Sequence, residues 1–148
     1  MNAALELINA LDGTRVLRHS SIYSSLPWGD EDQPDFLNAV AELQTRSQPR
    51  ELLTALKKIE RSLGRTPSER RWGPRVIDLD LLLAGKTVML SDELTLPHPR
   101  MHERAFVLLP LAELEPELDI PGKGRVQRLI SKMDIEGVKR LEALELCK

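Results

Sequence analysis

Two carboxylates stand inside an otherwise apolar run of this sequence, and their spacing constrains what the chain can fold into. Residues 76–83 read VIDLDLLL, so Asp78 and Asp80 lie two residues apart among aliphatic side chains. In a β-strand, residues two apart point to the same face, with Cα atoms about 6.5–7 Å apart. We therefore predict a strand here, with both aspartates on one face and the aliphatic residues at odd positions on the other.

The paired carboxylates require a positive partner. Two like charges repel each other, and burial would add a desolvation cost. A divalent metal could neutralise them, and Mg²⁺ suits the pattern because it takes hard oxygen ligands from one or two carboxylates and from substrate phosphates. Two-metal sites hold their ions roughly 3.5–4 Å apart, a distance that such a pair can bracket. An exposed strand face bridged to Arg75 remains the simpler explanation of an isolated Asp-x-Asp.

The loop before the aspartates favours a metal site over a simple exposed strand face. Residues 61–75 hold five arginines against the single acid Glu69. Arginine guanidinium groups match phosphate oxygens in a bidentate manner. An anion clamp next to a metal-binding pair is what phosphoryl transfer needs, since that chemistry depends on positioning and charge neutralisation. A solvated basic surface, or a loop that contacts nucleic acid, is the alternative.

Length and composition favour one small globular domain. The chain has 148 residues and a formal net charge of −2, which gives no global field that would attract nucleic acid or an anionic membrane. The only cysteine is Cys147, so a disulfide framework is excluded. The opening MNAALELINAL resembles an amphipathic helix, not a signal peptide, and no apolar run is long enough for a membrane span. We expect a single cytoplasmic domain over residues 1–148.

Hydrophobic periodicity and turn residues predict an α+β protein. Leucine and isoleucine recur every three or four residues in 47–64, with Pro49 in the first turn and Gly64 at the end. Strands and helices alternate irregularly, which favours α+β over a doubly wound α/β fold. We predict helices at 2–11, at 47–64, at 105–116 with an interruption near Pro110, and one or two short ones after 121. We predict strands at 16–23, 36–45, 76–83 and 87–90, with a polar loop at 24–35.

Few aromatic residues occur, and most lie beside polar segments. The sequence has five: Tyr23, Trp28, Phe36, Trp72 and Phe106. A core built from leucine does not need them, so some are expected to line a pocket for a flat ligand. In a strand, Asn38 would share the face of Phe36, and its amide could pair with the edge of a heterocycle. The alternative for Phe36 and Phe106 is an ordinary core position.

Four motifs together resemble one enzyme family. RWGPRVIDLDLLL, SSIYSSLPWGDEDQPDFLNAVAEL, LLTALKKIERSLGR and LTLPHPRMHERAFVLLPLAEL closely resemble, in order and spacing, the hydroxymethyl-dihydropterin pyrophosphokinase family of folate biosynthesis. The resemblance covers nearly the whole chain. It implies a ferredoxin-like α+β sandwich, with a mostly antiparallel sheet and helices packed on it. It also implies transfer of pyrophosphate from ATP to the hydroxymethyl group of a reduced pterin, with release of AMP.

The resemblance assigns roles to individual residues. Two Mg²⁺ ions bridging the ATP phosphates would be held by Asp78 and Asp80. The transferring group would be neutralised by Arg65 and Arg75. The ATP side would further include Glu60, Trp72, Leu81, Thr95, Leu96, His98 and Arg104. The pterin ring would lie between Phe36 and Phe106, and its polar edge would contact Asn38 and the backbone of Ser25, Leu26, Pro27, Trp28 and Gly29.

The sequence departs from the family pattern at three places. Phe36 stands where tyrosine occurs in the family, and Pro67 and Ser68 stand where a further basic residue is common. The chain also begins inside the helix that follows the family's first strand and its GSN-type turn. We therefore expect either a start further upstream or a 148-residue form that is less stable or catalytically weak. The expected protein is a monomer that binds ATP and a pterin alcohol. A non-catalytic descendant of the fold and a small nucleic-acid-binding module are the rival hypotheses.

Overall fold

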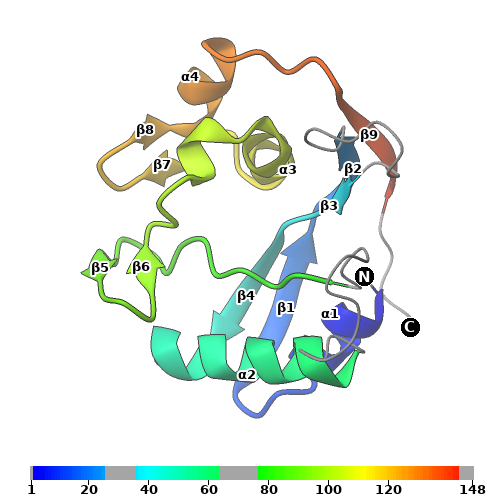
Figure 1. Ribbon diagram of the computed structural model, residues 1–148, viewed down its shortest axis with the longest axis vertical. Coiled ribbons are helices and arrows are strands. Elements are labelled where there is room, and N and C mark those ends of the chain that lie inside the picture. Colours follow the sequence, from blue (N-terminus) through cyan, green and yellow to red (C-terminus); the bar gives the residue numbers. More distant parts are fainter. Residues whose placement is uncertain (1, 26–35, 64–76, 144–148) are drawn as a thin grey trace. The chain divides into compact units, whose positions relative to one another are not determined.

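A computed structural model describes residues 2–25, 36–63 and 77–143 of the chain (Figure 1). The described residues divide into two compact units. The first unit contains residues 2–16, 43–63 and 77–81, and the second contains residues 17–25, 36–42 and 82–143. Helices and antiparallel strand pairs both occur, so the α+β class predicted from the sequence is confirmed.

Helices α1 (Asn2–Asn9) and α2 (Pro49–Ser62) pack together in the first unit. Pro49 is the first residue of α2, where its missing N–H costs nothing because the first turn has no intrahelical acceptor for it. The leucine and isoleucine spacing of α2 produces one buried side, as predicted. The core of this unit consists of Ile8, Leu52, Leu56 and Ile59. After α1 the chain turns at Gly13, whose φ of 74° favours glycine.

Two of the predicted strands are each split in two. The strand predicted over 16–23 is observed as β1 (Thr14–His19) and β2 (Ser21–Ser25), and the one over 36–45 as β3 (Phe36–Asn38) and β4 (Ala41–Thr45). Strand β1 pairs with β4, while β2 lies between β3 and β9 (Val138–Ala143). Strand β9 was not predicted, although the short helix α4 (Val126–Ser131) agrees with the expectation for the C-terminal region.

Ser20 explains the break between β1 and β2. Its amide donates to the carbonyl oxygen of Val40 at 2.8 Å, and its hydroxyl accepts the N–H of Val40 at 2.9 Å. The same hydroxyl donates to the carbonyl oxygen of Ser21 at 2.8 Å. Ser20 is only 1% exposed. One buried hydroxyl thus satisfies backbone groups at the point where regular pairing stops.

The strand predicted over 76–83 is wrong in its described part. Residues 77–84 belong to no strand, and residues 77–81 run as an extended coil (Figure 1). The reason is visible at Leu79, whose N–H donates to Glu60 Oε1 at 2.5 Å and whose carbonyl oxygen accepts from Lys57 Nζ at 3.0 Å. Side chains of α2 therefore occupy the backbone groups that a neighbouring strand would bond.

The second unit has its core around α3 (Ala105–Leu114), which packs on β2 and on the 3₁₀ turn η1 (Met101–Glu103). The predicted interruption at Pro110 is wrong, because α3 continues through it. Proline cannot donate to the carbonyl of Phe106 four residues earlier. Burial on both sides of the proline offsets that loss. The buried residues of this core are Met101, Leu108, Leu111, Ile120 and Val126, and Pro110 itself is buried.

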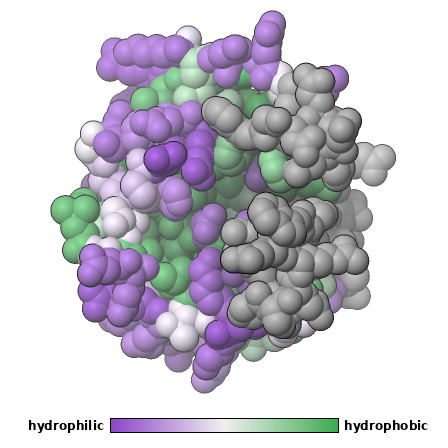
Figure 2. Space-filling model, in the orientation of Figure 1, coloured by the Kyte–Doolittle hydropathy of each residue, from purple (hydrophilic) through white to green (hydrophobic). Residues whose placement is uncertain are grey.

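Two short hairpins complete the second unit. The first joins β5 (Met89–Leu90) to β6 (Thr95–Leu96), so the strand predicted at 87–90 is present but shorter. The second joins β7 (Asp119–Ile120) to β8 (Gly124–Arg125). Apolar atoms project at the position of β5 in Figure 2, where Leu90 is 86% exposed. No helix within the described ranges is long and apolar enough to cross a membrane.

We predict that Ser20→Ala lowers the free energy of unfolding by about 1–3 kcal/mol, because it leaves the N–H of Val40 without its acceptor. Urea denaturation measures the change. Ser131→Ala is the matched control, since the Ser131 hydroxyl is exposed and donates only to the carbonyl of Arg128 within the same turn. Equal midpoints for the two variants would contradict the role of Ser20.

Candidate functional site

The two aspartates project on one side of their segment although no sheet holds it. Asp78 and Asp80 are exposed, while Ile77, before the pair, and Leu79, between the two aspartates, are half-buried. Leu79 and Leu81 pack against the core of the first unit. The predicted alternation is therefore present, because burial of the aliphatic side turns the carboxylates outward.

One cation beside Asp80 is Lys57. Its Nζ lies 3.7 Å from Asp80 Oδ1, 3.0 Å from Glu60 Oε1 and 3.0 Å from the carbonyl oxygen of Leu79. Sequence reasoning considered arginines and a divalent metal as partners and missed this lysine. Its signal in the sequence is the Lys57-x-x-Glu60 spacing, which places both side chains on one side of a helix.

The aspartate pair fits a hard divalent cation by its chemistry. Both candidate ligands are carboxylates that are open to solvent, and Mg²⁺ accepts one or two carboxylates when phosphates and water complete its coordination. Within residues 2–25, 36–63 and 77–143, no group of three or more His, Cys, Asp or Glu side chains gathers in a way that could hold a metal. The candidate ligands from the described part of the chain are thus Asp78 and Asp80.

Glu60 lies beneath this segment. Its residue is 3% exposed, and its Oε1 accepts both the N–H of Leu79 and the ammonium of Lys57. A buried carboxylate is costly unless it is hydrogen-bonded and paired with a cation, and both conditions hold here. Glu60 was expected on the ATP side. The structure places it inside the first unit, bonded to the backbone between the two aspartates.

Three of the residues expected around a pterin, Ser25, Phe36 and Asn38, share one face of β2 and β3. Asn38 lies opposite Tyr23 in the antiparallel register, and Phe36 lies opposite Ser25. Residues directly opposite each other share a face, and so do residues two apart along one strand. The prediction that Phe36 and Asn38 share a face is confirmed. Asn38 Nδ2 also donates to Ser25 Oγ at 3.3 Å.

Helix α3 is fastened to β2 by Glu113. Its Oε2 accepts the N–H of Ser21 at 2.9 Å and the Ser21 hydroxyl at 3.2 Å, while its Oε1 accepts the Tyr23 hydroxyl at 2.8 Å. Arg140 of β9 donates from Nε to Ser21 Oγ at 3.1 Å. Phe106 stands seven residues before Glu113, a spacing that puts both on one side of α3. From this spacing we expect the helix side that carries Phe106 to face the strand that carries Ser25.

In this contact the carboxylate of Glu113 is charged, and the hydroxyl of Tyr23 keeps its proton. Burial and the hydrogen bond to Glu113 raise the pKa of Tyr23 to about 12. Burial alone would raise the pKa of Glu113, but the bonds from Tyr23 and Ser21 together lower it. Sequence reasoning missed Glu113, and its signal is the seven-residue spacing from Phe106.

Arg104 and Phe106 lie two residues apart at the start of α3. The guanidinium carbon of Arg104 lies 5.6 Å from the centroid of the Phe106 ring, within the range of a cation–π contact. Arg104 was expected beside phosphate and Phe106 beside the pterin. The structure brings these two candidate side chains together.

The remaining expected ATP contacts occupy varied positions. His98 donates its N–H to the carbonyl of Leu82 at 2.8 Å, and its Nδ1 accepts the N–H of Arg100 at 3.3 Å. Thr95 is half-buried in β6, and Leu96 is a core residue with 1% exposure. Leu81 belongs to the margin of the first core. The other expected site residues lie outside the described residues: Arg65, Trp72, Arg75 and 26–29.

Comparison with known proteins identifies relatives along most of the chain. The family model for 7,8-dihydro-6-hydroxymethylpterin-pyrophosphokinase matches residues 1–116. A protein of Methylorubrum extorquens named 2-amino-4-hydroxy-6-hydroxymethyldihydropteridine pyrophosphokinase is 48% identical over 140 residues, which cover 94% of this chain and 87% of that protein. Proteins of the same name from Haemophilus influenzae and Pseudomonas aeruginosa are 42% and 43% identical. These matches cover 89% and 95% of this chain, and 82% and 86% of those proteins.

We predict that Glu113 makes stability depend on acid pH. Its pKa is lowered in the folded state, so its contribution is fully present above its unfolded pKa of about 4.3 and is lost as the pH falls through the folded pKa. In Glu113→Gln the free energy of unfolding should be lower at pH 7 and should fall less steeply below pH 5, as measured by urea denaturation across pH.

The control for this experiment is Glu117→Gln. The Glu117 side chain is 62% exposed and pairs with Arg125 at 3.1 Å, so its removal should change the acid-side slope much less. If Glu113→Gln keeps the wild-type slope, the carboxylate does not carry the pH dependence.

Proposed function

The chain belongs to the 7,8-dihydro-6-hydroxymethylpterin-pyrophosphokinase family, and from this premise we propose how its residues divide the work of the reaction. The enzyme transfers pyrophosphate from ATP to the hydroxymethyl group of 6-hydroxymethyl-7,8-dihydropterin, in folate biosynthesis. The substrate hydroxyl oxygen forms a bond to the β-phosphorus, and the bond from that phosphorus to the oxygen bridging the α-phosphate breaks. AMP leaves with the bridging oxygen, and the hydroxyl proton is released.

Asp78 and Asp80 would hold two Mg²⁺ ions. The support is their chemistry and their exposure on one side of a segment whose other side is buried. When bound, the ions supply charge neutralisation for the triphosphate. The contribution of the chain is to present two carboxylates that are already oriented toward solvent. Glu60 organises this side from beneath, through the backbone of Leu79.

The cationic residues would bind the ATP phosphates. Arg65 and Arg75 neutralise the transferring group, and this assignment rests on the sequence motifs that bracket the arginine-rich loop. Arg104 and His98 contact phosphate. Trp72 belongs to the loop that covers ATP. The adenosine would be bordered by Leu81, Thr95 and Leu96.

The pterin ring would bind in the second unit. Phe36 and Phe106 stack on it, while Asn38 and the backbone of Ser25–Gly29 pair with its polar edge. The support is that Ser25, Phe36 and Asn38 share one face, and that Glu113 fastens the helix carrying Phe106 to the same strand. Stacking needs two roughly parallel apolar surfaces, and β3 and α3 each supply one aromatic side chain.

The wider setting follows from these assignments. Residues 1–148 act as one pterin pyrophosphokinase domain, monomeric and cytoplasmic, with ATP and the pterin alcohol as its partners and with neither nucleic acid nor membrane among them. The observation that carries the function is the match of motifs along almost the whole length of relatives that share one name. Incubation with ATP, Mg²⁺ and the pterin alcohol should release AMP, and ADP alone or no nucleotide product would contradict it.

We predict that Asp80→Ala lowers kcat by at least about 100-fold, because one carboxylate ligand of the metal-bound triphosphate is lost. The fold should remain, since the Asp80 side chain is 53% exposed. AMP release followed by chromatography measures the rate. Asp92→Ala, at another exposed aspartate in a turn, should keep the wild-type rate. Near-normal turnover in Asp80→Ala would remove Asp80 from the metal site.

We also predict that Phe36→Ala weakens pterin binding by roughly 1–3 kcal/mol, the range for an aromatic ring that stacks on a base. Calorimetry with the pterin alcohol measures the loss, and ATP affinity should stay unchanged. Leu37→Ala is the matched control, because Leu37 is the next residue of β3, is 53% exposed and faces the opposite side. Equal effects of the two substitutions would place Phe36 outside the pocket.

A further inference from the structure

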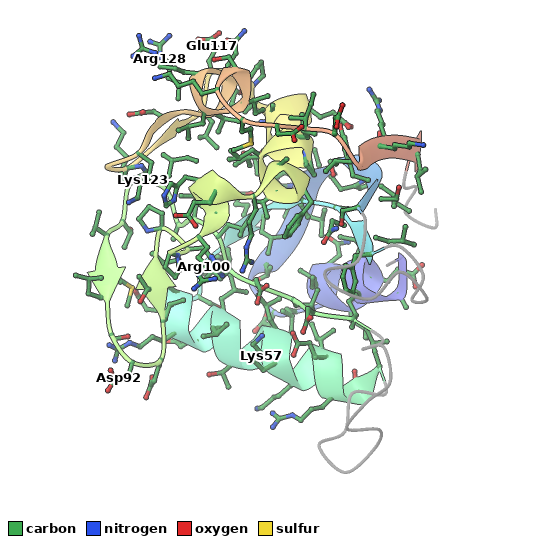
Figure 3. All side chains as sticks on the ribbon, turned by 45° about the horizontal axis from the view of Figure 1, so that its top comes forward. Lys57, Asp92, Arg100, Glu117, Lys123 and Arg128 are labelled. Atoms are coloured by element: carbon green, nitrogen blue, oxygen red, sulfur yellow. The ribbon has the colours of Figure 1, made fainter. Side chains whose placement is uncertain are left out.

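Two side chains of α2 bond both main-chain polar groups of Leu79, the residue between the aspartates. Glu60 Oε1 accepts the N–H of Leu79, and Lys57 Nζ donates to its carbonyl oxygen. Lys57 and Glu60 also bond each other at 3.0 Å. Figure 3 shows Lys57 rising from α2 on the side of this segment. We call these three interactions the Leu79 clamp.

The clamp fixes the two peptide planes that determine where the aspartates point. The N–H of Leu79 belongs to the peptide group shared with Asp78, and its carbonyl belongs to the peptide group shared with Asp80. Each peptide plane is therefore held by one bond: 2.5 Å from the Leu79 nitrogen to Glu60 Oε1, and 3.0 Å from Lys57 Nζ to the Leu79 carbonyl oxygen. A neighbouring β-strand would provide the same two kinds of bond.

Charge and burial explain why the clamp uses an ionic pair. Glu60 is 3% exposed, and a carboxylate buried to this degree is stable as an anion only with hydrogen bonds and a cation nearby. Lys57 supplies the cation, while its side chain remains 41% exposed. Its contact with Asp80, at 3.7 Å between two exposed groups, is a weak surface ion pair. A metal ion could displace that contact without disturbing the bonds to Leu79.

We propose that Lys57 and Glu60 are positioning residues for the metal pair, which preorganise Asp78 and Asp80 before the metal–nucleotide complex binds. This inference rests on the proposed function, in which the two aspartates are the metal ligands. Preorganisation lowers the entropic cost of ordering the ligands during binding. Groups that orient metal ligands typically change metal affinity by roughly 10–100-fold when they are removed.

The first test needs no metal and no catalysis. In the metal-free protein, Glu60→Ala should accelerate hydrogen exchange at the Leu79 amide, because that N–H loses its acceptor. Glu60→Gln should restore slow exchange, since its amide oxygen can accept the same bond. Unchanged exchange at Leu79 in Glu60→Ala would overturn the clamp whatever the enzyme does.

The second test measures what positioning does for binding. Calorimetry measures how the protein binds the α,β-methylene analogue of ATP at a series of MgCl₂ concentrations. In this analogue a methylene group replaces the oxygen that bridges the α- and β-phosphates, so the bond that breaks in the reaction stays intact. Glu60→Ala and Lys57→Met should weaken Mg²⁺-dependent binding by roughly 10-fold or more, while the KM for the pterin alcohol stays unchanged. At saturating Mg²⁺, kcat should recover most of its value.

Lys58→Met is the matched control, because Lys58 is the next residue of α2 and is exposed. It should bind the magnesium–nucleotide complex like the wild type. If Glu60→Ala does not fold, Lys57→Met decides the matter through the same titration, and wild-type Mg²⁺ dependence in it overturns the inference. If instead Asp80→Ala binds and reacts normally while the exchange result holds, the metal assignment fails and the clamp stands only as a structural element.

Discussion

The outward direction of Asp78 and Asp80 depends on burying the aliphatic side of a segment that has no place in a sheet. Leu79 and Leu81 contribute to the core of the first unit, and this leaves the carboxylates on the solvent side. Apolar burial alone does not fix a peptide plane, since it has no direction. The directional part comes from Glu60 and Lys57, which bond the backbone at Leu79. Apolar burial and the two hydrogen bonds at Leu79 together orient the aspartates, as pairing with a neighbouring strand usually would.

The second unit solves a related problem with one carboxylate. Glu113 accepts bonds from the backbone and hydroxyl of Ser21 and from the hydroxyl of Tyr23, so its desolvation is repaid by three donors. These bonds join a helix to a strand at defined positions along each. The stretch of α3 that carries Glu113 and the polar groups of β2 acquire a fixed relation as a result. A polar contact beside the apolar core therefore sets how α3 meets β2.

Sequence reasoning predicted local features well where a single element determines them. The spacing of Leu52, Leu56 and Ile59 predicted α2, and alternation predicted that Phe36 and Asn38 share a face. It failed where the outcome depends on distant partners. The strand expected at 76–83 is absent from its described part because α2 supplies the bonds, and β9 was not foreseen because its partner β2 lies more than 100 residues earlier. The break at Ser20 depends likewise on Val40, which is 20 residues away.

The proline inside α3 has a mechanical consequence. Pro110 cannot donate a hydrogen bond to the carbonyl of Phe106, so the helix is softer in bending at this turn than elsewhere. The stretch after the proline contains Glu113, which is anchored to β2, and the stretch before it contains Phe106. The Phe106 ring therefore lies on the stretch of α3 that can bend, while Glu113 holds the stretch after Pro110 against β2. If the pterin stacks on Phe106 as proposed, small changes of tilt at Pro110 would adjust the width of the stacking gap, and the buried Leu108 would move together with the ring.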